Sequence, residues 1–173
     1  MTPDELFHKL LLKAGAYTAR AEHSPKEVEK KLYDWGGDET SPEVVRQVLQ
    51  ELEKGGYIDA ARYASKYTRD KALLLHKGPK MIRRELYEKG ITDREMVAEA
   101  LGEIEDEEWA EALNAYLKPK LRQYRAKARN ASDLSQRLYR AAYARGYEDR
   151  QIRAYLKEAK LSAEETEEPD VWD

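Results

Sequence analysis

The sequence predicts an all-α protein of about nine short helices, and three observations lead to this prediction. Strong helix formers (Ala, Leu, Glu, Lys and Arg) fill most of the 173 positions. Apolar residues recur at spacings of three and four, as they do on the buried face of a helix. No segment alternates apolar and polar residues for long enough to indicate a strand.

Helix starts are marked by proline or by a capping residue. The stretches TPDE at residues 2–5 and SPKE at residues 24–27 each place a hydroxyl at the N-cap, proline at the first helical position and glutamate at the third. This capping box satisfies two N–H groups that the helix leaves unpaired. Residues 41–43 (SPE) and 92–95 (TDRE) are variants of the same signal. Helix ends are predicted at glycines that can adopt a left-handed conformation, namely Gly36, Gly37, Gly55, Gly56, Gly90 and Gly146.

Between these boundaries the apolar residues form helical faces in three successive groups. The first group contains Leu6, Leu10, Ala14, Tyr17, Val28, Leu32, Trp35, Val45, Val48, Leu49 and Leu52. The second contains Ala61, Ala64, Tyr67, Ala72, Leu75, Ile82, Leu86, Met96, Val97, Ala100, Leu101 and Ile104. The third contains Trp109, Leu113, Tyr116, Leu117, Leu134, Leu138, Ala141, Ile152, Tyr155 and Leu156.

The middle helices of the three groups can be overlaid on one another. Residues 29–37 read EKKLYDWGG, residues 83–91 read RRELYEKGI and residues 139–147 read YRAAYARGY, so that Leu or Ala, then Tyr, then Gly recur in register. A period of about 55 residues indicates a three-helix unit that is used three times. Each unit alone buries too little surface, so we expect three tandem three-helix repeats that share a core in an elongated, curved array.

This period sets the predicted domain boundaries. We expect a first repeat at residues 1–55, a second at 56–105 and a basic third at 106–161. Residues 162–173 form an acidic segment with few apolar residues, which predicts a disordered tail. The tail could fold back and compete with a polyanion for the basic third repeat, or it could serve only to keep the protein soluble.

Features that catalysis or metal binding would need are missing from the sequence. Without cysteine there is no disulfide, thiolate zinc site or thiol nucleophile, and His8, His23 and His76 lack the spacing of a helical metal pair. Phosphate-binding, dinucleotide-binding and hydrolase nucleophile motifs are absent as well. The N-terminus lacks the apolar run of a signal peptide, and no later run reaches membrane length. We therefore expect a cytoplasmic protein with no catalytic residue, no metal and no cofactor.

The net charge of −3 conceals blocks of opposite sign. Residues 62–94 hold 10 Lys and Arg against 4 Asp and Glu, and residues 118–160 hold 13 against 4. Residues 95–117 hold 8 Asp and Glu and residues 161–173 hold 6, with no Lys or Arg in either block. The basic blocks are either solvated faces whose long side chains cover the core or a surface for a polyanion or an acidic protein partner. We favour the second interpretation because neutralising acids are missing locally.

The cations of the basic blocks and of the adjoining helices are the candidate contact residues. They are Arg62, Lys77, Lys80, Arg83, Arg84, Lys89, Lys120, Arg122, Arg125, Lys127 and Arg129. Tyr116, Tyr124 and Tyr139 lie among them and could either stack on bases or pack in the core.

Residues 55–91 resemble the core of the RecX family of bacterial regulatory proteins. The first part of the family pattern is filled by Gly56, Tyr57, Ile58, Asp59, Arg62, Tyr63 and Ala64, and the second by Gly78, Pro79, Ile82, Leu86, Lys89, Gly90 and Ile91. The likeness extends to SPKEVEKKL at residues 24–32 and to a basic third unit that ends in a Gly-Tyr turn. Two departures are Ala60, where the family usually has an acid, and Pro119, which lies where a long helix is expected and could kink it or start a new one.

The resemblance implies a monomeric helical protein that binds the filament of the RecA recombinase on DNA. It implies modulation, most directly inhibition, of RecA ATPase, strand exchange and co-protease activity in recombination, DNA repair and the SOS response. The alternative is a helical module that binds single- or double-stranded DNA without RecA. A third interpretation is an inert helical scaffold.

The motif residues also have structural roles that follow from their types. Asp59 should cap a helix, and the tyrosines and isoleucine around it should pack between repeats. Gly78 and Pro79 should start a helix that Gly90 ends. We therefore expect the following motif residues to be architectural: Gly56, Tyr57, Ile58, Asp59, Tyr63, Gly78, Pro79, Ile82, Leu86 and Gly90.

Overall fold

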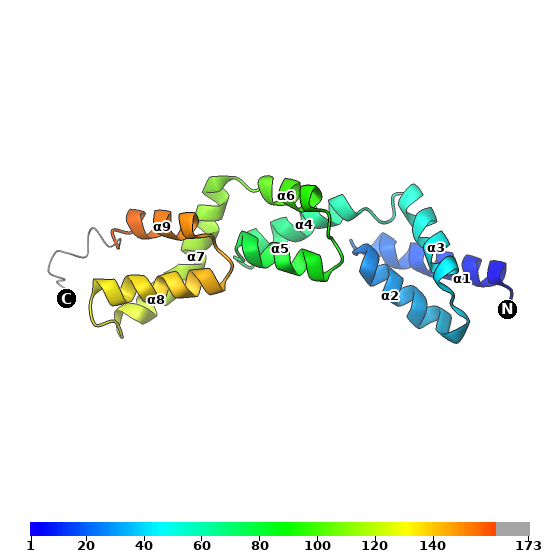
Figure 1. Ribbon diagram of the computed structural model, residues 1–173, viewed down its shortest axis with the longest axis horizontal. Coiled ribbons are helices and arrows are strands. Elements are labelled where there is room, and N and C mark those ends of the chain that lie inside the picture. Colours follow the sequence, from blue (N-terminus) through cyan, green and yellow to red (C-terminus); the bar gives the residue numbers. More distant parts are fainter. Residues whose placement is uncertain (162–173) are drawn as a thin grey trace. The chain divides into compact units, whose positions relative to one another are not determined.

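The computed structural model describes residues 1–161, and over this range the protein is built from helices (Figure 1). The nine α-helices of the described range are α1 (Pro3–Arg20), α2 (Pro25–Gly36), α3 (Pro42–Lys54), α4 (Ala60–Leu73), α5 (Pro79–Glu88), α6 (Arg94–Gly102), α7 (Asp106–Arg125), α8 (Ala131–Ala144) and α9 (Asp149–Glu158). A 3₁₀ turn, η1 (Gly37–Glu39), follows α2. The all-α class and the number of helices predicted from the sequence are confirmed. The tail predicted at residues 162–173 lies outside the described residues.

The described chain is divided into two compact units. The first contains residues 1–66 and 86–98, and the second contains residues 67–85 together with the described residues from 99 onward. Helices α4, α5 and α6 therefore each contribute residues to both units. The predicted boundaries of the three repeats and the curved, elongated array stay predictions.

The helix starts of the first unit follow the capping signals in the sequence. Thr2 and Ser24 each accept a hydrogen bond from the N–H of the glutamate three residues later, at 3.1 Å in both cases, and each glutamate returns a bond to the N-cap N–H. Ser41 caps α3 in the same way, because its hydroxyl accepts from the N–H of Val44 at 3.3 Å. These three predictions are confirmed.

Aspartates start α4 and α6. The Asp59 carboxylate accepts from the N–H of Arg62 at 3.0 Å, which confirms its predicted capping role. In the TDRE stretch the capping residue is Asp93 and not Thr92, since Asp93 accepts from the N–H groups of Glu95 at 3.0 Å and Met96 at 3.2 Å. A carboxylate at this place also suits the positive end of the helix dipole.

Glycines end the helices with left-handed backbone, as predicted. Gly37, Gly56, Gly90 and Gly146 have φ values of +63°, +74°, +88° and +97°. In the two glycine pairs only the second glycine is left-handed, and the first keeps a helical conformation. The left-handed residue that follows the end of α2 or α3 is therefore the second member of each pair.

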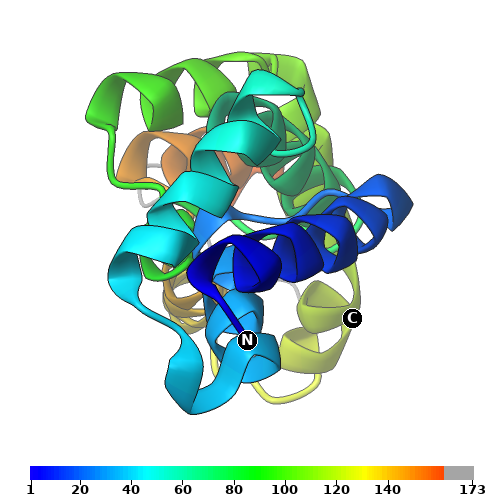
Figure 2. The same cartoon turned by 90° about the vertical axis from the view of Figure 1, so that its right-hand side faces the viewer.

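The core of the first unit forms where α1, α2 and α3 pack on one another. Figure 2 shows α1 (dark blue) lying across α3 (cyan), and both helices also contact α2. Leu10, Ala14, Val28, Leu32 and Val48 are fully buried in this core. All five were predicted from the three-and-four spacing.

In the second unit α7 packs on α8 and α9. Leu117, Leu134, Leu138 and Ile152 are fully buried. Helix α7 continues through Pro119, so the alternative that Pro119 starts a new helix was wrong. The buried face that ends at Leu117 holds the helix in place, while Pro119 itself is exposed, where its missing N–H costs least.

Equivalent positions of the three overlaid middle helices have the same burial. Leu32, Leu86 and Ala142 are each fully buried, whereas the tyrosines that follow them are exposed. Two predicted face positions were wrong: Ala61 is exposed on α4, and Leu75 is exposed in the loop that follows the end of α4 at Leu73. Thr68 occupies a fully buried position on α4 instead.

Candidate partner-binding surface

The start of α5 meets the turn between α8 and α9 at a close backbone crossing within the second unit. The N–H of Gly78 donates to the carbonyl of Arg145 at 2.9 Å, and the N–H of Lys80 donates to the carbonyl of Gly146 at 2.9 Å. A Cβ atom on Gly78 would lie 2.3 Å from the backbone nitrogen of Tyr147. Only glycine therefore fits at this crossing, which places the first turn of α5 beside the end of α8.

The crossing brings Lys80 to a pair of tyrosines on α8. The Lys80 ammonium lies 4.7 Å from the ring centroid of Tyr143, within the range of a cation–π interaction. Tyr143 stacks against Tyr139 with 6.1 Å between ring centroids, and the Tyr139 hydroxyl donates to Asp149 at 2.7 Å. Tyr143 is exposed although its ring contacts both Lys80 and Tyr139.

A second set of cations and tyrosines lies on α7 and the end of α8. The Lys120 ammonium is 5.3 Å from the ring of Tyr116 and 5.9 Å from that of Tyr124. The guanidinium of Arg145 lies 5.1 Å from the Tyr116 ring and donates to the carbonyl of His76. Arg145 thus joins α7 to the loop that precedes α5.

We call these seven residues the cation–tyrosine surface: Lys80, Tyr116, Lys120, Tyr124, Tyr139, Tyr143 and Arg145. It combines cations with aromatic rings, so it can offer charge to phosphates or carboxylates and flat rings to bases or planar side chains. The interleaving of Tyr116, Tyr124 and Tyr139 with cations was recognised from the sequence. The contact of each ring with a particular cation was not.

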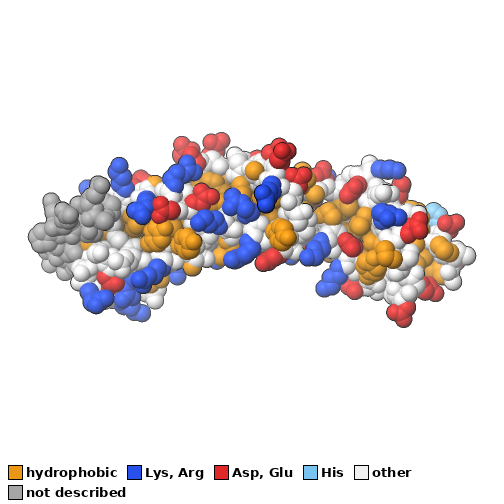
Figure 3. All heavy atoms as spheres, in the orientation of Figure 1, with side chains coloured by type: hydrophobic (Ala, Val, Ile, Leu, Met, Phe, Trp, Pro, Cys, Tyr) orange, Lys and Arg blue, Asp and Glu red, His pale blue; other side chains and the backbone are white. Residues whose placement is uncertain are grey.

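Beside this surface, α5 presents two further cations. Arg83 and Arg84 are exposed and form no ion pair with any residue that the structure describes. Figure 3 shows Lys and Arg side chains over α5 and over the ends of α7 and α8. Arg122 and Lys127 are likewise exposed and have no ion pair within residues 1–161. Arg125 is the last residue of α7.

Four of the predicted contact residues are held in ion pairs that stabilise the fold. Arg62 pairs with Glu22 at 2.6 Å, Lys89 with Glu27 at 3.3 Å, Lys77 with Glu85 at 2.8 Å and Arg129 with Asp133 at 3.9 Å. In each pair one residue lies on a helix and the other in an adjoining or neighbouring loop. The structure therefore divides the predicted cations into a group that fastens helices and a group whose charge faces solvent.

Lys77 belongs to a half-buried polar cluster with Glu85 and Tyr67. Glu85 accepts hydrogen bonds from the Lys77 ammonium at 2.8 Å and from the Tyr67 hydroxyl at 2.6 Å. Burial opposes ionisation of Glu85, but the bonds from Lys77 and Tyr67 outweigh it and lower the pKa of Glu85 below its ordinary value. The cluster ties the loop before α5 to α5 itself.

The lowered pKa of Glu85 predicts a loss of stability in acid. A group whose pKa is lower in the folded state stabilises the fold above its unfolded pKa, and this contribution disappears as the pH falls through the folded pKa. We expect Glu85→Gln to lower the free energy of unfolding by about 1–2 kcal/mol near pH 7. The difference from the parent protein should shrink below about pH 4. Urea unfolding at several pH values measures it, and Glu88→Gln, an exposed carboxylate of the same helix, is the control.

Two residues of the cation–tyrosine surface, Tyr143 and Arg145, are not among the contact residues predicted from the sequence. Tyr143 was recognised only as a repeat position equivalent to Tyr33 and Tyr87, and all three rings are exposed. Arg145 follows the end of α8 and was counted only as part of a basic block. An exposed tyrosine repeated in register was the available signal for Tyr143. Nothing local identifies Arg145, because its partners lie about 70 residues earlier in the chain.

Within residues 1–161 no three His, Cys, Asp or Glu side chains are grouped so that they could hold a metal ion. None of the helices in this range is both long enough and apolar enough to cross a membrane.

Comparison with known proteins agrees with the resemblance found in the sequence. Residues 59–101 match the family model of the second three-helix domain of RecX. The chain is 26% identical over 167 residues to the regulatory protein RecX of Listeria welshimeri, a match that covers 96% of this chain and 60% of the relative. It is 33% identical over 98 residues to the regulatory protein RecX of Leuconostoc citreum, covering 57% of this chain and 35% of the relative. The matched region thus spans between about one third and three fifths of these relatives.

Solved structures show the same fold. The crystal structure of RecX from Lactobacillus salivarius matches with a TM-score of 0.80 at 22% identity, covering 92% of this chain and 99% of that one. A second crystal structure, of a regulatory protein RecX, matches with a TM-score of 0.79 at 23% identity, covering 90% of this chain and 73% of that one. The predicted resemblance to the RecX family is therefore confirmed, in sequence over the second three-helix domain and in fold over about nine tenths of the chain.

Proposed function

We propose that this protein is a regulator that binds the RecA–DNA filament and modulates RecA, most directly by inhibiting its ATPase, strand-exchange and co-protease activities. Its setting would be recombination, DNA repair and the SOS response in the cytoplasm. The observation that carries this proposal is the match of residues 59–101 to the second three-helix domain of RecX. The relatives that match over a larger share of the chain are named regulatory protein RecX.

The charge distribution supports a nucleoprotein partner over naked DNA. Exposed cations on α5 and α7 can meet phosphates or acidic side chains without ordering a loop first, because they sit on helices. The whole chain nevertheless has a net charge of −3, which disfavours strong binding to free DNA. A RecA–DNA filament carries the phosphates of its DNA, which local basic patches can contact.

The proposal assigns different roles to the two groups of cations. The contact residues are those facing solvent, Lys80, Arg83, Arg84, Lys120, Arg122 and Lys127. Arg62, Lys77 and Lys89 connect helices to loops through their ion pairs. Arg129 contacts Asp133 only at 3.9 Å and stays exposed, and Arg125 adds to the basic end of α7. The motif glycines and apolar residues shape the scaffold. In this proposal no residue is catalytic, no metal or cofactor takes part, and the protein acts as a monomer.

One observation favours the alternative of a module that binds single-stranded DNA without RecA. The cation–tyrosine surface places Lys120 between Tyr116 and Tyr124, and alternating cations and rings are suited to stacking unpaired bases. The two functions differ in what they need: the alternative needs only DNA, whereas the proposed function needs RecA.

Binding measured by fluorescence anisotropy separates the two functions. Labelled single-stranded oligonucleotide is titrated with the protein, alone and after coating with RecA and a non-hydrolysable nucleotide, at several salt concentrations. We expect the RecA-coated strand to be bound at least about tenfold more tightly at physiological salt. Equal affinity for bare and coated strands, with a steep salt dependence, would support the alternative instead.

A further inference from the structure

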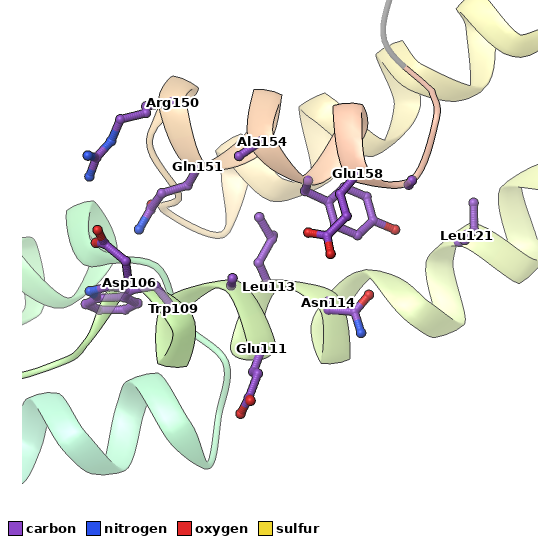
Figure 4. Close-up of a pocket in the computed structure, with 13 residues that line it drawn as sticks. Asp106, Trp109, Glu111, Leu113, Asn114, Leu121, Arg150, Gln151, Ala154 and Glu158 are labelled. Atoms are coloured by element: carbon purple, nitrogen blue, oxygen red, sulfur yellow. The ribbon is translucent and has the colours of Figure 1, made fainter. Parts of the chain in front are cut away.

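A groove runs between α7 and α9 within the second unit (Figure 4). Its volume of about 560 Å³ lies within the range of about 300–1,000 Å³ that is usual for ligand-binding pockets. Trp109 and Leu113 of α7 form its buried floor, and Leu121 and Tyr155 lie half-buried along it. The three-and-four spacing predicts Trp109, Leu113 and Tyr155 only as core positions, and Leu121 is not among the residues that it selects.

The groove stays open because small side chains face it. Ala110 of α7 and Ala154 of α9 are exposed and line the groove, and Figure 4 shows Ala154 pointing towards α7. An alanine in each helix leaves apolar backbone and Cβ surface accessible between the helices without filling the space. The groove is therefore apolar at its base and reachable from solvent along its length.

Its edges are acidic. Asp106, Glu111 and Glu158 line the groove against a single cation, Arg150, among the described lining residues. None of the three carboxylates forms an ion pair with a residue in the described part of the chain. Figure 4 shows Asp106 near one end of the groove and Glu158 on α9 with its carboxylate turned towards α7.

The position of Glu158 does not stabilise the helix to which it belongs. It is the last residue of α9, where the helix dipole is negative and a carboxylate is unfavourable. Asp106, in contrast, lies in the first turn of α7, where a carboxylate stabilises the helix. The Glu158 carboxylate thus adds negative charge to the groove although it lowers the stability of α9.

The dimensions and charge of the groove select one kind of occupant. On α7 the lining extends from Asp106 to Leu121, a distance of about 22 Å, which matches about four turns of helix. Amphipathic helices bind such grooves through apolar residues spaced by three and four. The acidic edges favour lysine or arginine beside those residues, and they disfavour the chain's own residues 162–173, which carry six carboxylates and no cation.

We propose that the α7–α9 groove binds a short amphipathic helix of a protein partner whose apolar face is flanked by lysine or arginine. This surface is distinct from the cation–tyrosine surface and takes a partner of opposite charge. The proposal does not depend on binding to RecA.

Two labelled fourteen-residue helical peptides test it, with identical leucines at helical spacing and either lysines or glutamates elsewhere. Fluorescence anisotropy measures their binding to the full chain in the absence of RecA and DNA. We expect the lysine peptide to bind at least about tenfold more tightly than the glutamate peptide. Ala154→Arg, which fills the groove and places a cation in it, should weaken the lysine peptide by at least about tenfold. Ala115→Arg, at an exposed position of α7 outside the groove, should not.

A second variant tests the contribution of charge. Replacing Glu158 with Gln and Asp106 with Asn should reduce the preference for lysine over glutamate while the protein stays helical. The proposal is overturned if neither peptide binds, if both bind equally, or if Ala154→Arg leaves binding of the lysine peptide unchanged. Because no RecA is present, the absence of peptide binding would not count against the proposed regulatory function. In the same way, the absence of an effect on RecA would not count against the α7–α9 groove as a peptide-binding site.

Discussion

Charge reversal of Arg83 and Arg84 to glutamate is expected to weaken binding to the RecA–DNA filament by about tenfold to a hundredfold. Each side chain is exposed on α5 and forms no ion pair with a described residue, so each can give its full charge to a partner. One favourable surface contact contributes up to about 1 kcal/mol, and reversal replaces attraction with repulsion at two positions. The helical content measured by circular dichroism should not change, because neither side chain fastens the fold.

A control for this variant must carry the same change in net charge elsewhere. Lys9→Glu with Lys30→Glu meets this condition, since both lysines are exposed in the first unit and lie outside the cation–tyrosine surface. The control should bind the filament within about twofold of the parent protein at physiological salt. If both double variants lost affinity equally, general electrostatic attraction and not α5 would account for binding.

Gly78→Ala is expected to destabilise the protein by about 3 kcal/mol or more. The added Cβ would lie 2.3 Å from backbone atoms of Gly146 and Tyr147, and backbone cannot move aside as a side chain can. Relief of the clash must separate α5 from the end of α8 and weaken two backbone hydrogen bonds, each of which contributes about 1 kcal/mol. Urea unfolding measures the loss.

Gly15→Ala is the matched control for a glycine substitution. Gly15 lies inside α1, and a Cβ there would meet nothing within 4 Å. Alanine should therefore raise the free energy of unfolding by about 0.5–1 kcal/mol, the usual difference between alanine and glycine in a helix. A Gly78→Ala protein as stable as the parent would contradict the close crossing of α5 with the α8–α9 turn.

Local signals made the helices predictable. The capping boxes at Thr2 and Ser24 and the left-handed glycines each act within a few residues, so the sequence contains the whole interaction. The course of a helix could not be predicted from the sequence where tertiary packing determines it. Pro119 is tolerated inside α7 because the rest of the helix is held against α8 and α9, and a local signal cannot show that.

The candidate site was predictable in residue type but not in pairing. The basic blocks were visible as charge counts, and the solvent-facing arginines of α5 come from them. Lys89 and Arg62 form ion pairs with Glu27 and Glu22, which lie 62 and 40 residues away in the sequence. Counting the charges within one basic block cannot reveal such long-range pairs. The contact of Lys80 with Tyr143 likewise exists only after α5 and α8 have met.

The rate of ATP hydrolysis by RecA on single-stranded DNA, measured with increasing amounts of this protein, tests the central claim most directly. The regulatory function predicts that the rate falls with concentration to a plateau, and that the Arg83→Glu, Arg84→Glu variant needs about tenfold to a hundredfold more protein for the same effect. A rate that stays unchanged at a saturating concentration of the parent protein would contradict the proposed function.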